Sequence, residues 1–357
     1  MIERTLPILA GGLPEHFVWN WALLAMVGTL VVVVALTEAI LSRYLRIMLN
    51  IFTDTPPPLS MGPLDFQRIE GEHVQFRAAD GVSLHGMFLT GRHEPKRRGM
   101  IIFCHEFGSD MYSCARYIRP LLDAGFDVFT FDFRGHGQSS NIPNYTPRQW
   151  PSNREVSDCI GAFAYVQSVL AGEGLPEQFG VFGISRGAGA ALMAMAGDPA
   201  ARCIVTDGAF STDVTLESLI KRWAYIFAKV KFLYENHPPA FWQFLRWRLF
   251  HRAHRRFNCR FPSVRKAIGR MSPRPIFFIH GERDSYIRCE QTRYLYSLAP
   301  QPKFLWIVPA AKHNQSAVVA PDAYRTRTVA FFERFLAGIE GSMEHLEALT
   351  PSIAEVA

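Results

Sequence analysis

The sequence lacks the patterns that identify several common classes of protein. Its six cysteines have neither the spacing of a metal site nor that of a disulfide framework. Thiols that are left free favour a reducing compartment. There is no internal repeat, which argues against a repeat architecture. There is also no recognised nucleic-acid-binding module, so we expect no nucleic-acid partner.

Charge is absent from one stretch near the start of the chain. No charged residue occurs from Val18 to Thr37, and about 20 apolar residues are enough to span a bilayer. The stretch is too long for the core of a signal peptide, so we expect a single-pass transmembrane anchor at 18–41 after a short tail at 1–17. A buried core helix is the alternative. The free cysteines favour a catalytic domain on the cytoplasmic side, although basic residues at the two ends are nearly balanced.

A Pro-rich stretch follows the expected anchor. The run from Thr53 to Pro63 contains Pro56, Pro57 and Pro58 and cannot continue a helix. We therefore expect residues 42–65 to form a semi-rigid linker between the anchor and the soluble part of the chain.

Ser185 lies in the pattern Gly-x-Ser-x-Gly, between Gly183 and Gly187. An apolar run that is typical of a buried strand precedes it, and a run of small residues that is typical of a helix follows. Glycines on either side allow a sharp strand-to-helix turn that exposes the serine hydroxyl. The alternative is an ordinary flexible turn. The context favours a nucleophile elbow with Ser185 as the nucleophile.

A base and an acid follow the serine in the order that such a turn requires. Asp284 comes just after the apolar run that ends at Ile279, and His313 follows the next run, which ends at Val308. The carboxyl ends of parallel strands meet at one edge of a sheet, so we expect Ser185, Asp284 and His313 to converge. Asp207, at the end of another expected strand, is the rival acid.

Two backbone amides are expected to stabilise a developing oxyanion. One is the N–H of Arg186, which follows the nucleophile at the start of a helix. The other is the N–H of Phe107, in the loop after the expected strand at Met100. Three histidines and Asp132 occur in turn motifs, where we expect them to brace loops; the histidines are His105, His136 and His280.

Four motifs together resemble the α/β-hydrolase superfamily, near its serine aminopeptidase and monoglyceride lipase-like branch. They are the hairpin from Ala79-Asp80-Gly81-Val82 to Gly86, the loop at His105, the run from Phe131 to Ser139, and the elbow with its two partners. The resemblance covers about Phe66 to Leu336 and implies a mostly parallel central sheet with helices on both faces. The sequence departs from the family at Glu106, where a glycine usually follows the histidine.

A long segment between the sixth and seventh expected strands is poor in acidic residues. From Lys221 to Arg270 there are 13 lysines and arginines and one acid, Glu235. We interpret residues 212–270 as a helical lid that carries a basic, aromatic-rich surface toward anionic lipid. A solvated basic face is the alternative.

These features predict one α/β domain, with a hydrolase core at 66–211 and 271–340 and a tail at 341–357. The predicted function is a membrane-anchored serine hydrolase that cleaves carboxylic esters, acylated or lipid-like, and needs no metal or organic cofactor. The alternatives are a peptidase or amidase of the same fold, and a non-catalytic scaffold that binds lipid or protein. Glu106 is the residue that most favours the scaffold.

Overall fold

The computed structural model describes residues 15–50, 53, 69–93, 96–227, 238–340 and 346. The chain divides into two compact units, Met1–Ile51 and Phe52–Ala357. Three predicted segments fall largely outside the described residues: the first part of the N-terminal tail, most of the Pro-rich linker, and the C-terminal tail apart from Leu346.

The first unit contains one long helix, α1 (Glu15–Leu49). Within it, Asn20–Leu49 includes a stretch of 18 residues with a mean hydropathy of 2.4, and the span is long and apolar enough to cross a membrane. A signal sequence near the N-terminus would have the same character. The helix continues past residue 41, where we expected the linker to begin. The sequence contains no glycine or proline between Leu41 and Pro56 to end it earlier.

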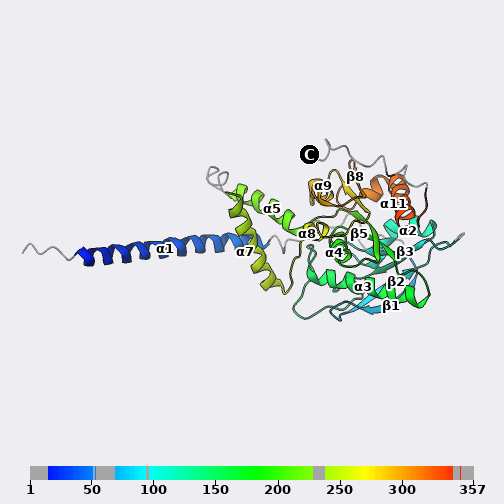
Figure 1. Cartoon of the computed structure of the whole chain (residues 1–357), viewed down its shortest axis with the longest axis horizontal. Coiled ribbons are helices and arrows are strands. Elements are labelled where there is room, and N and C mark those ends of the chain that lie inside the picture. The colour runs from blue at the N-terminus through cyan, green and yellow to red at the C-terminus, as the bar shows by residue number, and fades with distance from the viewer. Residues whose placement is uncertain are drawn as a thin grey trace, which may run out of the picture. The chain divides into compact units, whose positions relative to one another are not determined.

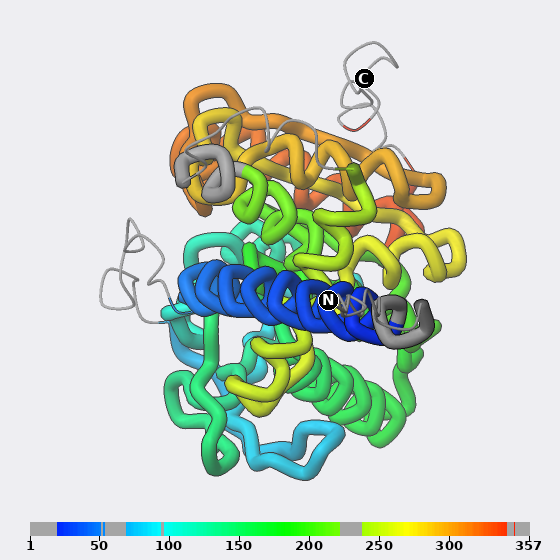
Figure 2. Tube along the Cα trace, turned by 90° about the vertical axis from the view of Figure 1, so that its left-hand side faces the viewer, coloured from blue at the N-terminus to red at the C-terminus, as the bar shows by residue number. Residues whose placement is uncertain are grey.

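The second unit is built on an eight-stranded sheet of order β1-β2-β4-β3-β5-β6-β7-β8. Its first strands, β1 (Glu72–Arg77) and β2 (Ser83–Leu89), are antiparallel neighbours, and β2 is also antiparallel to β4. The remaining pairs are parallel. The parallel strands are β3 (Gly99–Cys104), β4 (Phe126–Phe131), β5 (Phe179–Ile184), β6 (Ala201–Asp207), β7 (Ile276–Gly281) and β8 (Lys303–Val308). Figures 1 and 2 show β1 and the C-terminal elements at opposite ends of this unit.

Helices cover both faces of the sheet (Figure 1), as the sequence predicted. On one face the core includes α3 (Asn153–Gly172), α4 (Arg186–Met195), α8 (Val264–Ile268) and α9 (Cys289–Leu298). On the other it includes α2 (Ala115–Asp123) and α11 (Pro321–Phe335). Short turns η3 (Met111–Cys114) and α10 (Ser316–Val319) precede those two helices. In β4, Phe129 packs on the first face and Val128 on the second, because side chains alternate along a strand.

The described part of the segment between β6 and β7 consists of helices joined by loops. It contains α5 (Thr212–Phe227), α7 (Pro239–Phe257) and α8; residues 228–237 of the predicted lid lie outside the described part. Glu217 of α5 forms ion pairs with Lys221 of the same helix and with Arg246 of α7. The pair with Arg246 joins the two helices. The buried side of α7 is a stripe of apolar residues at helical spacing: Trp242, Leu245, Leu249, Ala253 and Phe257.

Candidate active site

Ser185 stands at a strained turn between β5 and α4. Its φ is +50°, a region that side chains other than glycine rarely enter. The flanking glycines are needed because there is no space for a side chain. A Cβ at Gly183 would lie 2.5 Å from Cα of Ala188, and one at Gly187 would lie 2.3 Å from the carbonyl oxygen of Cys104. The turn therefore has the backbone form of a nucleophile elbow.

The three residues that the sequence placed in a triad lie together in the structure. Ser185 Oγ is 2.9 Å from Nε2 of His313, and Nδ1 of His313 is 2.5 Å from Oδ2 of Asp284. A carboxylate can only accept, so the imidazole proton is on Nδ1 and Nε2 accepts from the serine hydroxyl. The side chains come from the ends of β5, β7 and β8, which are brought to one edge by the parallel sheet.

Asp284 is held by four donors. The amides of Tyr286 and Ile287 bind Oδ1 at 2.9 and 2.8 Å, while His313 and His280 Nε2 bind Oδ2. Burial alone would raise the pKa of this carboxyl. The hydrogen bonds from His280 and His313 outweigh burial and hold the pKa of Asp284 well below its usual range. Asp284 is thus a fixed negative charge behind His313.

The side chain of Asp207, the rival acid, forms hydrogen bonds with residues other than His313. Its two oxygens accept hydrogen bonds from the hydroxyls of Ser316, at 3.0 Å, and Tyr324, at 3.2 Å. Burial raises the pKa of Asp207 to about 6. Its backbone carbonyl accepts from the amide of Ser185 at 2.7 Å, so Asp207 supports the elbow through the main chain.

The loop after β3 is braced by its histidine. His105 Nδ1 donates to the carbonyl of Glu106 at 2.6 Å, and its Nε2 accepts from the amide of Phe133 at 3.1 Å. Burial lowers the pKa of His105 well below its usual range, so the ring is neutral and can make both bonds. Glu106 accepts a hydrogen bond from Ser113 Oγ at 3.1 Å, and burial raises the pKa of its carboxyl.

The two predicted oxyanion donors are available in the structure. Among the described residues, the backbone amides of Phe107 and Arg186 donate to no other group. The buried Arg186 guanidinium lies 5.1 Å from the ring centres of both Phe107 and Phe133. It also lies 3.6 Å from the carboxylate of Glu155. The contact between Arg186 and Phe107 connects the elbow to the loop after β3.

A model of the alpha/beta hydrolase family matches residues 82–327, a range that contains the elbow and both of its partners. The chain belongs to the α/β-hydrolase family. Membership of this family supports hydrolase activity for this protein. Within the described residues, no group of three or more His, Cys, Asp or Glu side chains is arranged to hold a metal ion.

Similar proteins have been found among both sequences and structures. The uncharacterized protein YfhR of Escherichia coli (strain K12) is 25% identical over 266 residues, which covers 73% of this hydrolase and 80% of YfhR. The esterase Pf2001 of Pyrococcus furiosus has a TM-score of 0.54 at 24% identity and covers 78% of this chain and 97% of Pf2001. The alpha/beta hydrolase GrgF from Penicillium sp. sh18 has a TM-score of 0.56 at 16% identity, with coverages of 75% and 100%. At these identities the structural likeness shows the fold alone.

Sequence reasoning missed two features in the site of this α/β hydrolase. It assigned His280 to loop bracing, and the ring does bind the carbonyl of Ile287 at 2.7 Å, but it also contacts Asp284. It did not identify Asn314, which is 4% exposed and whose side-chain oxygen and nitrogen both lack a partner among the described residues. The position of Asn314 next to His313 was the only signal.

Proposed function

We propose that this protein is a serine hydrolase that cleaves carboxylic esters. The observation that carries the proposal is the hydrogen-bonded chain from Ser185 Oγ through His313 to Asp284. The strained elbow and the unpaired amides of Phe107 and Arg186 support it, because a tetrahedral intermediate needs both an exposed nucleophile and oxyanion donors.

In the proposed reaction, His313 Nε2 takes the hydroxyl proton of Ser185 as Oγ attacks the ester carbonyl carbon. The amides of Phe107 and Arg186 hydrogen-bond the oxyanion. The intermediate then collapses, the bond to the alcohol oxygen breaks, and His313 returns the proton to the leaving alcohol. The acyl group remains on Ser185 until water, deprotonated by His313, releases the acid and restores the serine. The negative charge of Asp284 stabilises the imidazolium that forms in each half of the cycle.

Labelling with a fluorophosphonate probe tests the nucleophile. The wild type should be labelled, whereas Ser185→Ala should not be, and ester turnover should fall by roughly 10⁴ to 10⁶. Ser109→Ala is the matched control, because Ser109 is a buried serine of the loop after β3 and should leave labelling intact. An adduct mapped to another residue would contradict the assignment. Absence of labelling in the wild type would favour the non-catalytic scaffold.

We further propose that the substrate is an acylated, poorly soluble ester and that α5, α7 and α8 act as a lid against a lipid surface. The outer side of α7 exposes Phe244 (45%) and Trp247 (62%), which stack on each other at 6.0 Å. Arg248 lies over the ring of Phe244. Exposed aromatic rings beside arginines suit the boundary between headgroups and acyl chains. A clear preference for short, water-soluble esters, or for peptide amides, would overturn this assignment of substrate.

We propose that α1 anchors the protein in a membrane, with the catalytic unit on the cytoplasmic side. The support is the length and apolar character of Asn20–Leu49 and the set of free cysteines in the second unit. Full-length protein should stay with membranes after an alkaline carbonate wash, and protease should cleave the second unit only from the cytoplasmic face. Release by carbonate, or loss of the first residues by processing, would contradict the anchor.

A further inference from the structure

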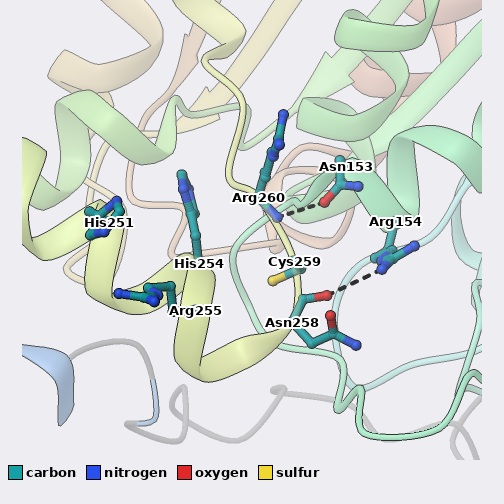
Figure 3. A pocket seen from close by; sticks show the side chains of 8 residues that line it. All are labelled: Asn153, Arg154, His251, His254, Arg255, Asn258, Cys259 and Arg260. Atoms are coloured by element: carbon teal, nitrogen blue, oxygen red, sulfur yellow. Dashed lines mark hydrogen bonds between the residues drawn. The ribbon is translucent and has the colours of Figure 1, made fainter.

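A cleft separate from the triad lies between the end of α7 and the start of α3 (Figure 3). Its volume is about 590 Å³, within the range of small-molecule sites. It is lined by Asn153, Arg154, His251, His254, Arg255, Asn258, Cys259 and Arg260. None of these residues belongs to the proposed catalytic machinery.

The lining carries an excess of positive charge. Three of the eight residues are arginines and none is acidic. The exposed side chains of Arg255 and Arg260 make no hydrogen bond or ion pair within the described part of the chain. An anion entering the cleft would therefore not have to displace an existing partner from these two guanidinium groups.

The carboxylate that pairs with Arg154 is already engaged. Arg154 lies 3.4 Å from Asp80, but both oxygens of Asp80 accept from the buried guanidinium of Arg134, at 2.7 and 2.8 Å. The hydrogen bond from Arg134 holds the pKa of Asp80 at about 2, so its charge is shared between two arginines. The second contact of Arg154 is with the carbonyl of Asn258 at 3.3 Å, a neutral acceptor that does not cancel the positive charge of the guanidinium.

The walls of the cleft are fixed by hydrogen bonds. The amide of Asn153 donates to the carbonyl of Arg260 at 2.8 Å, and the amide of Arg260 donates to Oδ1 of Asn153 at 2.6 Å (Figure 3). The Nδ2 group of Asn153 remains as a donor. His254 Nε2 accepts from the amide of Phe261 at 3.1 Å, so its neutral ring carries a proton on Nδ1. The cleft thus presents donors in a preformed arrangement.

We propose that this cleft binds a phosphate group. Planar guanidinium groups bind phosphate oxygens in pairs, and several of them together match a multiply charged tetrahedral anion better than a single carboxylate. The proposal goes beyond ester hydrolysis, because no part of it uses Ser185. The phosphate could belong to a free ion or to a lipid headgroup. The two sources differ in whether acyl chains add to the affinity. His251 at the cleft stacks on the exposed ring of Trp247, so the acyl chains of a lipid would meet an apolar surface beside the cleft.

The test uses the full-length chain in a neutral detergent. The chain carries Ser185→Ala, so that no ligand is hydrolysed. The binding result is then independent of whether the protein cleaves esters. Calorimetry would measure binding of inorganic phosphate and of dihexanoyl phosphatidate at constant ionic strength. Arg255→Gln with Arg260→Gln should weaken binding at least about tenfold. Arg119→Gln with Arg325→Gln is the matched control, because it removes the same charge from exposed arginines on α2 and α11, and its effect should stay within about twofold.

Each outcome decides a part of the proposal. Equal affinity for phosphate and phosphatidate indicates recognition of the free ion, and tighter binding of phosphatidate indicates a lipid headgroup. The proposal is overturned if neither ligand binds, if both pairs of substitutions weaken binding equally, or if succinate binds as well as phosphate. The substituted side chains are exposed, and circular dichroism would check that both double variants keep the fold.

Discussion

The ends of β6 and β7 carry two carboxylates that are both buried but whose pKa values are shifted in opposite directions. Asp207 and Asp284 are 1% and 5% exposed, and both follow central strands of the same sheet. Hydroxyl groups are the side-chain donors to Asp207, and burial raises its pKa to about 6. Two imidazoles and two amides donate to Asp284, and its pKa is lowered. Burial raises the pKa of both carboxyls, and the hydrogen bonds from His280 and His313 reverse the direction of the shift at Asp284.

The largest expected effect of this difference is on catalysis. Asp284→Asn should lower ester turnover by roughly 10⁴, because the amide would hold His313 in the wrong tautomer. Asp207→Asn is the matched substitution on the neighbouring strand and should leave turnover within about tenfold of wild type, since the hydrogen bonds of its side chain go to Ser316 and Tyr324. Steady-state kinetics on both folded variants would measure the contrast. Greater damage from the Asp207 variant would reverse our assignment of the acid.

A smaller effect is expected on the pH dependence of stability. The pKa of Asp207 is higher in the fold than in the unfolded chain, where it is near 3.8. The stability that Asp207 contributes is thus fully present below pH 3.8 and is lost as the pH rises through about 6. For Asp284 the shift is opposite, so its contribution is present at neutral pH and is lost as the pH falls through its lowered pKa.

Between pH 4.5 and 7.5, the free energy of unfolding of the wild type should fall by roughly 1 to 3 kcal/mol relative to that of Asp207→Asn. Comparing the two proteins cancels the contributions of other titrating groups. Urea unfolding followed by tryptophan fluorescence at the two pH values would measure the difference. Parallel pH dependence in the two proteins would mean that the hydroxyl donors keep Asp207 ionised.

The parts of the site that could be predicted are those that depend on short patterns in the sequence. The elbow depends on two glycines and a serine in alternate positions, and the strand that the apolar run before Ser185 predicted is β5 (Phe179–Ile184). The order of Ser185, Asp284 and His313 along the chain was sufficient to bring them together once parallel strands were assumed. Asp284 could not be separated from Asp207 in this way, because both simply follow a strand.

The remaining features depend on contacts between distant segments. The buried Arg186 guanidinium lies over the rings of both Phe107 and Phe133, a contact that no spacing in the sequence indicates. The basic cleft forms only where the end of α7 meets the start of α3, and the sequence showed the charge of this segment without its concave shape. The proposed roles of the anchor and lid remain predictions.

The positive φ of Ser185 decides which variant isolates the chemistry of its hydroxyl group. A residue with a Cβ in this conformation costs on the order of 1 to 3 kcal/mol, which the surrounding fold must offset. Alanine keeps that strain and removes only the oxygen, so Ser185→Ala separates reactivity from folding. Glycine would relax the turn as well, and an inactive Ser185→Gly protein would be more resistant to denaturation than the active enzyme. The turn that exposes the proposed nucleophile therefore lowers the stability of the folded protein.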